Sequence, residues 1–190
     1  MLDKRQSSIR SFWAHLAGSV HPDDKAVFDR HPNHTFKLQF PPTPFVGRAD
    51  TAPVVILMLN GGYGPGETEA EFPDEAAIAE YLKYIREGEV PPCGRYYTSL
   101  SYWDLIAAGK AVLVNAVPYR SAGGLSKNKG VAEQFQSLDA HRRWLTQEVL
   151  PEAARGNRFV LAHRFGWWNL GKEEYAGPSV IFSPFPDFPR

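Results

Sequence analysis

Two apolar runs constrain the fold of this chain more than any other feature of its sequence. Residues 54–59 and 111–114 are continuously apolar and consist mostly of β-branched or long aliphatic side chains. Runs of this length and composition are typical of strands that are covered on both faces. An asparagine follows each run, Asn60 after the first and Asn115 after the second. The sequence therefore predicts two buried neighbouring strands, each ending on an amide side chain.

Helix and strand signals alternate along the rest of the chain. Residues 7–18 place apolar side chains at helical spacing behind a serine, and residues 73–88 begin with proline and acids and end on glycine. Two further strands are predicted within 157–162 and 178–190. The other expected segments are helices at 99–109, 131–154 and 163–170, turns at 21–34, an extended stretch at 39–53 and a loop at 61–72. This alternation predicts one α/β domain over residues 1–190, a three-layer α/β/α sandwich with a central, largely parallel four-stranded sheet.

Charge and cysteine content narrow the classes of partner and compartment. The 21 basic residues balance 21 acidic ones, so the total charge favours no polyanionic partner. A lone cysteine, Cys93, excludes an internal disulfide and a multi-cysteine metal site. The N-terminus is charged where a signal peptide needs an apolar stretch, and no apolar run approaches ~20 residues. We therefore expect a cytoplasmic monomer with no membrane contact, no metal and no cofactor.

Histidines are concentrated near the N-terminus, which raises the question of a metal site. His21, His31 and His34 fall on no single helical face, and two of them precede a proline. Exposed histidines in turns are much commoner than histidine metal sites. The pattern therefore predicts surface turn residues here rather than metal ligands.

The carboxyl ends of parallel strands form the edge of a sheet at which ligands usually bind. If the two predicted strands are neighbours, Asn60 and Asn115 lie together at that edge. An amide donates and accepts hydrogen bonds at once, as recognition of a nucleobase edge or of a held water requires. A strand-end asparagine can instead cap a turn through its own backbone. Both interpretations stay open on the sequence alone.

The glycine-rich stretch GGYGPGE after Asn60 matches neither common phosphate-binding pattern. A dinucleotide fingerprint needs GxGxxG with an acidic residue at the end of a second strand, and a Walker loop needs a Gly-Lys-Ser ending. The stretch is followed by neither an acidic residue at the end of a second strand nor a Gly-Lys-Ser ending. Its remaining use is a tight turn that brings the backbone close to a flat ligand, with Tyr63 as an aromatic wall.

Three basic clusters interrupt the neutral chain, at residues 126–130, 141–143 and 155–158. Taken singly, each is typical of solvated surface. If the clusters share one face with the strand ends, they are placed to contact DNA phosphates, and the affinity for DNA would then depend on salt.

These segments resemble the motif regions of the uracil-DNA glycosylase superfamily. Residues 44–67, PFVGRADTAPVVILMLNGGYGPGE, are similar to its first motif, where a strand ends in a pattern such as Gly-x-Asn-Pro-Gly or Gly-Gln-Asp-Pro-Tyr. Residues 110–121, KAVLVNAVPYRS, are similar to the second, where a strand-end asparagine presents its amide to a flipped base. Residues 157–168 and 178–186 follow in the order of the last two strands and the His-Pro-Ser-Pro motif. The resemblance implies the α/β/α fold of that superfamily.

The resemblance also implies a function, a monofunctional hydrolase that removes uracil or a related deaminated base from DNA in base excision repair. Asn60 matches the residue that holds the attacking water, and Asn115 matches the amide that reads the base. Tyr63 lies where the family lines the base pocket, and Arg120 lies where an arginine can meet a phosphate. The substrate-binding residues that it implies are Gly61, Gly62, Tyr63, Asn115, Tyr119 and Arg120.

The sequence departs from the family pattern at three positions. Gly61 replaces the proline of the first motif, and Leu59 replaces a glycine. Ser183 stands where many members carry the histidine that stabilises the departing base anion, so Ser183 is the second catalytic candidate beside Asn60. Without hydrolysis, the same fold would serve as a nucleobase-, nucleotide- or DNA-binding module. A third alternative is an α/β hydrolase of small metabolites, although the sequence has no Gly-x-Ser-x-Gly elbow.

Overall fold

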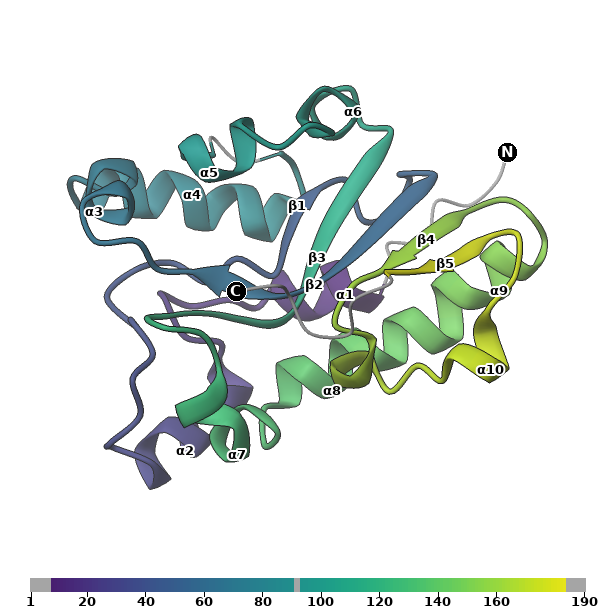
Figure 1. Ribbon diagram of the computed structural model, residues 1–190. Coiled ribbons are helices and arrows are strands. Elements are labelled where there is room, and N and C mark those ends of the chain that lie inside the picture. The colour runs from purple at the N-terminus through teal and green to yellow at the C-terminus, as the bar shows by residue number, and fades with distance from the viewer. Residues whose placement is uncertain (1–7, 91–92, 184–190) are drawn as a thin grey trace.

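A five-stranded mixed sheet forms the centre of the structure (Figure 1). The computed structural model describes residues 8–90 and 93–183. The strands are β1 (Phe45–Gly47), β2 (Val54–Gly62), β3 (Ala111–Ser121), β4 (Phe159–Ala162) and β5 (Val180–Phe182). They lie in the order β1-β3-β2-β4-β5, with β1 antiparallel to β3 and the other pairs parallel. The two apolar runs, β2 and β3, therefore lie side by side as predicted.

The predicted count of four strands was wrong, because β1 forms inside the stretch 39–53 that was expected to be merely extended. The strand is only three residues long, and prolines precede it. Gly47 has a φ of +111°, and a Cβ there would lie 2.7 Å from the carbonyl oxygen of Ala111. Glycine thus permits the close antiparallel approach of β1 to β3. This pairing is a tertiary contact, and the local sequence of residues 45–47 does not predict it.

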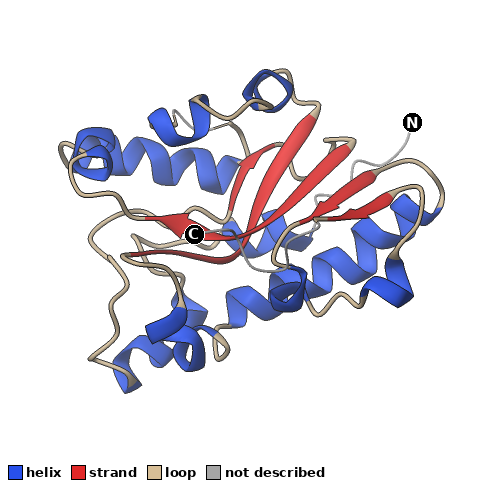
Figure 2. Ribbon diagram, viewed as in Figure 1, coloured by secondary structure: helices blue, strands red, loops and turns tan. Residues whose placement is uncertain are grey.

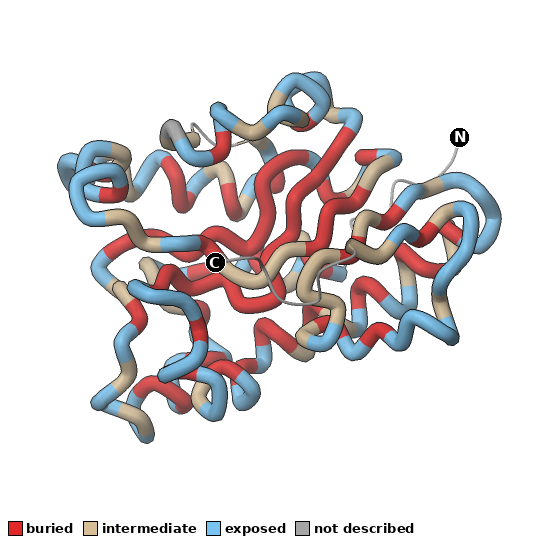
Figure 3. Tube along the Cα trace, viewed as in Figure 1, coloured by how far each residue is buried: buried red, intermediate tan, exposed pale blue. Residues whose placement is uncertain are grey.

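The apolar character of β2 and β3 reflects burial on both faces of the sheet. Val55 and Leu57 belong to the larger core, whereas Ile56 belongs to a second core together with Leu113 of β3 and Val46 of β1. Burial is concentrated along these strands and on the helix faces turned toward them (Figure 3). Apolar side chains on each face of the sheet must be buried, and the helices that alternate with the strands bury them.

Helices lie on both sides of the sheet (Figure 2). Above it in Figure 1 lie α3 (Glu67–Glu71), α4 (Glu75–Glu87), α5 (Arg95–Thr98) and α6 (Trp103–Ala107). Below it lie α1 (Ser8–Trp13), α2 (Pro22–Arg30), α7 (Lys129–Ala132), α8 (Gln136–Trp144), α9 (Leu150–Ala154) and α10 (Lys172–Tyr175). The α/β class is confirmed, and the likeness of this arrangement to the glycosylase fold stays a prediction. No helix within the described ranges is long and apolar enough to cross a membrane.

The helix predicted for 73–88 is confirmed, with both of its ends where the sequence signals them. The Asp74 side chain accepts a hydrogen bond from the backbone N–H of Ala77 at 2.9 Å. Gly88 ends the helix in the left-handed conformation, with a φ of +68°. These are standard capping arrangements, and each satisfies backbone groups that a helix end leaves without partners. The helix expected at 99–109, the short helical segment expected at 163–170 and the later strands are confirmed as well, up to residue 183. The rest of the segment 178–190 lies outside the described residues.

The long helix predicted for residues 131–154 is interrupted twice. Phe135 has an extended conformation that separates α7 from α8, and its side chain is fully buried. A π-helical turn, η2 (Leu145–Val149), then joins α8 to α9. Pro151 follows this turn, has no N–H and would crowd the carbonyl four residues earlier, which explains the local widening of the helix.

Residues 21–34 were expected to form turns, but they contain α2. His21 caps this helix by accepting a hydrogen bond from the N–H of Asp23, and Pro22 occupies the first turn. His21 is 2% exposed, so the prediction of an exposed turn histidine was wrong at this position. Proline at the start and aspartates in the first turn were the signals of a helix here.

A buried hydrogen-bonded chain joins α1, α8 and β3. The indole N–H of Trp13 donates to Nε2 of His141 at 2.8 Å, and Nδ1 of His141 lies 2.8 Å from the carbonyl oxygen of Asn115. Because a carbonyl only accepts, Nδ1 carries the proton and the ring is neutral. Burial lowers the pKa of His141 to about 4. The neutral ring is therefore part of the folded core.

Stability should fall as the solution is acidified through this range. The unfolded chain takes up a proton at His141 near its ordinary pKa of 6.5, whereas the folded protein resists protonation until about pH 4. The contribution of neutral His141 to the free energy of unfolding is fully present above pH 6.5. About 3 kcal/mol of it is lost by pH 4. Urea unfolding at pH 7.5, 6, 5 and 4 measures it. His141→Gln should lower stability at pH 7.5 and flatten the pH dependence; an unchanged slope would contradict the assignment.

Candidate functional site

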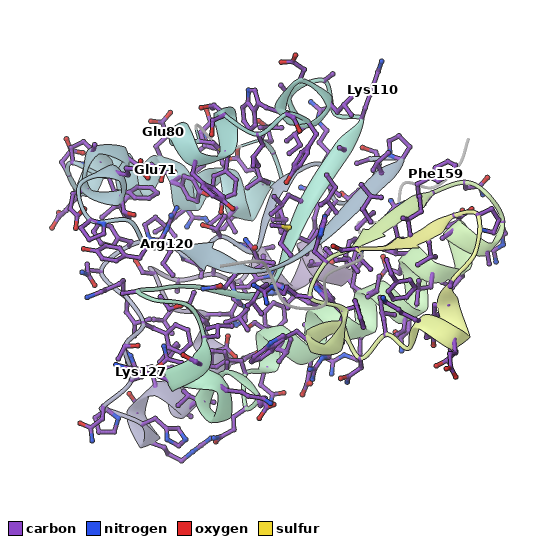
Figure 4. The ribbon with its side chains drawn as sticks, viewed as in Figure 1. Glu71, Glu80, Lys110, Arg120, Lys127 and Phe159 are labelled. Carbon is purple, nitrogen blue, oxygen red and sulfur yellow. The ribbon has the colours of Figure 1, made fainter. Side chains whose placement is uncertain are left out.

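A small cavity lies at the carboxyl ends of β2 and β3, where ligands usually bind in parallel sheets. Its volume is about 120 Å³. Gly62 contributes from the last residue of β2, Arg120 from the end of β3, and Glu71 from α3 (Figure 4). We name this the base cavity after the ligand that the sequence resemblance implies, and its other lining residues are Tyr63, Glu67, Thr68, Gly94, Tyr96 and Tyr97.

Arg120 and Glu71 form a buried ion pair at the base cavity. Arg120 Nη2 lies 3.4 Å from Glu71 Oε2, and the two side chains are 4% and 10% exposed. Nη1 of Arg120 donates to the carbonyl oxygen of Gly62, also at 3.4 Å. Both distances are long, and within the described part of the chain Nε has no hydrogen-bond partner. Because its terminal nitrogens make only long contacts with protein groups, this guanidinium has capacity to donate to a ligand.

The carboxylate of Glu71 is positioned from its other side by backbone. The N–H of Gly94 donates to Oε1 of Glu71 at 3.0 Å, and a Cβ at Gly94 would lie 2.7 Å from Oε2. Burial, and after it the charge of Glu71, raises the pKa of the Cys93 thiol to about 12. Burial likewise raises the pKa of Tyr97 to about 12. A desolvated site that already holds a carboxylate disfavours a second anion and suits a neutral polar ligand.

Tyr63 is an aromatic residue in the wall of the base cavity, and its predicted role beside a flat ligand stays a prediction. Its hydroxyl donates to Oε1 of Glu69 at 2.5 Å, and its ring lies 5.9 Å from the ring of Phe40. The Nζ of Lys37 lies 5.0 Å from the centre of the ring. These contacts fix the ring, although nothing in them selects a ligand. Phe72, the other aromatic neighbour, is buried in the core beneath Arg120.

Asn60 lies two residues before Gly62 and does not line the base cavity. The hydroxyl of Ser121 lies 3.0 Å from the carbonyl oxygen of Gly124, to which it donates its only proton, so it accepts from Nδ2 of Asn60 at 2.9 Å. This orients the amide. Oδ1 of Asn60 accepts no hydrogen bond within the described ranges, and the residue is half-buried. The oxygen is therefore available to hold a water molecule.

Asn115 lies in the middle of β3, and the prediction that the strand ends there was wrong. The strand continues to Ser121, and Asn115 pairs with Met58 of β2. Its Nδ2 donates to the carbonyl oxygen of Thr43 at 2.7 Å, and the residue is 2% exposed. The two amides accordingly do not share the base cavity, because Asn115 is used to attach the segment before β1 to the sheet.

The remaining predicted site residues also lie outside the base cavity. Tyr119 is buried, and its hydroxyl donates to Oδ2 of Asp24 at 2.7 Å, which is a structural contact between β3 and α2. Gly61 is buried beside Thr43, where a Cβ would lie 3.4 Å from the Thr43 side chain. Ser183 follows the edge strand β5, two strands away from β2, and its N–H donates to the carbonyl oxygen of Ala162. The structure thus brings together Gly62, Tyr63 and Arg120 from the predicted set.

Sequence reasoning missed the acidic partner of the site. Glu71 was expected to lie in a loop, and it comes instead from the short helix α3 that follows GGYGPGE. The tyrosines of the base cavity, Tyr96 and Tyr97, come from α5, far from the two motifs in sequence. The dense acids of residues 67–71 were the one available signal. Within the described ranges no group of three or more His, Cys, Asp or Glu side chains could hold a metal ion.

Three comparisons with known proteins found no match to this chain. No protein-family model, no curated protein and no solved structure matches this chain. The resemblance in the motif regions therefore stands on the quoted residues alone.

A double-mutant cycle tests the buried pair. Arg120→Met should cost about 3–5 kcal/mol of unfolding free energy, because it leaves the Glu71 carboxylate buried without its cation. Adding Glu71→Gln should recover much of that loss, so the two effects should be far from additive. Urea unfolding at pH 7.5 of the wild type, the single variants and the double variant gives the coupling energy. Additive effects would show that the pair is not coupled.

Proposed function

We propose that this chain binds a nucleobase or a similar single-ring heterocycle in the base cavity. The observation that carries the proposal is the pair of Arg120 and Glu71 in the wall of the base cavity, in which the terminal nitrogens of Arg120 make only long contacts of 3.4 Å. Together they offer a donor and an acceptor on adjacent groups. The hydrogen-bonding edge of a nucleobase carries carbonyl acceptors next to ring N–H donors, which is the complementary pattern.

The size and the charge of the base cavity favour the binding of a small neutral ring. Pockets for drug-sized ligands span about 300–1,000 Å³, whereas this one is about 120 Å³. Tyr63 and Tyr96 supply aromatic surface for stacking, as nucleobase sites commonly do. Glu67 also lines the cavity, and Glu69 follows in the same short helix, so the rim is acidic and disfavours phosphate. The geometry therefore favours recognition of the base itself.

A second candidate function is the hydrolysis that the family resemblance implies, removal of a deaminated base from DNA. In that reaction water attacks the sugar carbon C1′, the bond from C1′ to the base breaks, and the base leaves with the bonding electrons. Asn60 supports this candidate, because its Oδ1 is free to hold the water. Ser183 is not the group that would stabilise the departing base, since it does not line the base cavity. Arg120 is the buried cation placed to take that role.

Base binding is tested by the melting temperature of the protein with free uracil, cytosine and hypoxanthine. A true ligand at 100 times its Kd should raise Tm by about 5–10 °C. Tyr96→Ala should weaken binding about tenfold or more by removing a stacking surface. The matched control is Phe159→Ala, another exposed aromatic, at the start of β4 and away from the base cavity, and this variant should bind normally (Figure 4). If no base shifts Tm, or if both variants bind like the wild type, the proposal fails.

Hydrolysis is tested with oligonucleotides that contain uracil, hypoxanthine or a mismatch, followed by alkali. Asn60→Ala should slow strand scission about 10–100-fold, because the water loses its positioning group. Ser121→Ala removes one of the two hydrogen bonds that orient the amide but keeps Oδ1 and the bond to the carbonyl oxygen of Gly61, so it should slow scission less than Asn60→Ala does. Background scission on every substrate would refute hydrolysis while leaving base binding to be judged by Tm.

A further inference from the structure

A second pocket, of about 360 Å³, lies beyond the carboxyl end of β4. It forms where α7 and α8 meet the 3₁₀ turn η3 (Phe165–Trp168). Among the residues that the structure describes, three cationic side chains line it, Lys129 of α7, Arg142 of α8 and Arg164 between β4 and η3, together with one carboxylate, that of Glu133. Three positive charges and one negative charge leave a formal charge of +2. We name it the cationic pocket; none of its lining residues lines the base cavity.

Arg142 is held in place for recognition. Its Nε donates to the carbonyl oxygen of Trp167 at 2.9 Å, which links α8 to η3 and orients the guanidinium. Its Nη1 lies 3.8 Å from Oδ1 of Asp139, too far for a hydrogen bond, and the side chain is 21% exposed. Burial lowers the pKa of Arg142, so its charge is partly desolvated. A positioned arginine with spare terminal N–H groups is suited to a bidentate oxyanion.

Arg164 reaches the cationic pocket from a strained backbone. Arg164 and Asn169 bracket η3 with φ values of +53° and +54°, and they are the only non-glycine residues with positive φ in the described part of the chain. Asparagine tolerates this conformation, but arginine in it costs about 1 kcal/mol or more. Strain of this kind is found preferentially at ligand sites. Both residues line the cationic pocket.

The carboxylate in the pocket does not neutralise it. Oε1 of Glu133 lies 3.8 Å from Nζ of Lys129, and the two side chains are 50% and 65% exposed. A solvated pair at this distance contributes little to stability. Lys129 can therefore turn to an entering anion at small cost.

We propose that the cationic pocket binds a phosphate group, presented by a nucleic-acid backbone or by a free phosphate ester. Two guanidinium groups and an ammonium come from three separate elements, and this arrangement matches a tetrahedral dianion better than a planar carboxylate. Trp167 and Phe165 provide apolar surface beside the charges. Two of the basic clusters in the sequence, 126–130 and 141–143, thereby contribute to one site.

Phosphate binding is tested by measuring Tm during a titration with inorganic phosphate. Potassium chloride keeps the ionic strength constant. Tm of the wild type should rise with phosphate and not with chloride. Arg142→Gln should weaken the phosphate response about tenfold. Arg143→Gln is the matched control, because Arg143 is exposed on the same helix and does not line the pocket. An equal response in both variants, or none in the wild type, overturns the proposal.

Two further variants separate binding from folding. Arg164→Gly removes a charge from the pocket and relieves the positive φ, so the phosphate response, measured against the variant's own Tm without phosphate, should weaken. Glu133→Gln removes the competing carboxylate and should tighten phosphate binding severalfold. Arg164→Gly binding phosphate as the wild type does, or Glu133→Gln binding it more weakly, would overturn the assignment.

A fluorescent single-stranded oligonucleotide distinguishes the two sources of phosphate. If the nucleic-acid backbone is the ligand, inorganic phosphate should displace the oligonucleotide, and Arg142→Gln should reduce the slope of log Kd against log salt by about one. If a free phosphate ester is the ligand, the Tm response persists without oligonucleotide binding. Tyr96→Ala should leave the response to inorganic phosphate unchanged, because Tyr96 does not line the cationic pocket, so failure of base recognition and failure of phosphate binding are separable.

Discussion

The pairing of β2 with β3 is the constraint on which the rest of the structure depends. The register is regular from Val54 opposite Ala111 to Asn60 opposite Val117, and the next pair is Gly62 opposite Ser121. Between these pairs β3 advances four residues and β2 only two. Pro118 lies within this irregularity and has no N–H to donate to a ladder, which is a usual cause of a bulge. The shift places Ser121 against the amide of Asn60 and Arg120 beside Gly62.

The same irregularity separates the carboxyl edge, where the proposed site lies, from the adjoining part of the sheet, where polar side chains bond to other segments of the fold. Before it, side chains such as that of Asn115 are enclosed by the segment that precedes β1 and by α8. After it, the strands separate from the regular ladder, and the terminal nitrogens of Arg120 make only long contacts, each of 3.4 Å, with Gly62 and Glu71.

The two pockets have opposite electrostatic character. The base cavity pairs its cation with Glu71 and has a second carboxylate, that of Glu67, in its wall. The cationic pocket collects Lys129, Arg142 and Arg164 against one carboxylate. A neutral ring suits the first and a phosphate suits the second, because desolvated charge favours a ligand of complementary charge. Charge that balances over the whole sequence is thus divided unequally in space.

The sequence by itself determined the α/β class, the two central strands and the caps of α4, because these follow from apolar runs and from local hydrogen bonding at Asp74 and Gly88. It also pointed to Tyr63 and Arg120 as site residues. Only the tertiary structure decided that Asn115 is a structural residue, since its partner Thr43 is 72 residues away. Likewise, only the fold brought Glu71 to Arg120 and assembled three cations from separate elements. Local patterns report periodicity and caps, whereas the partners of buried polar groups depend on contacts between segments remote in sequence.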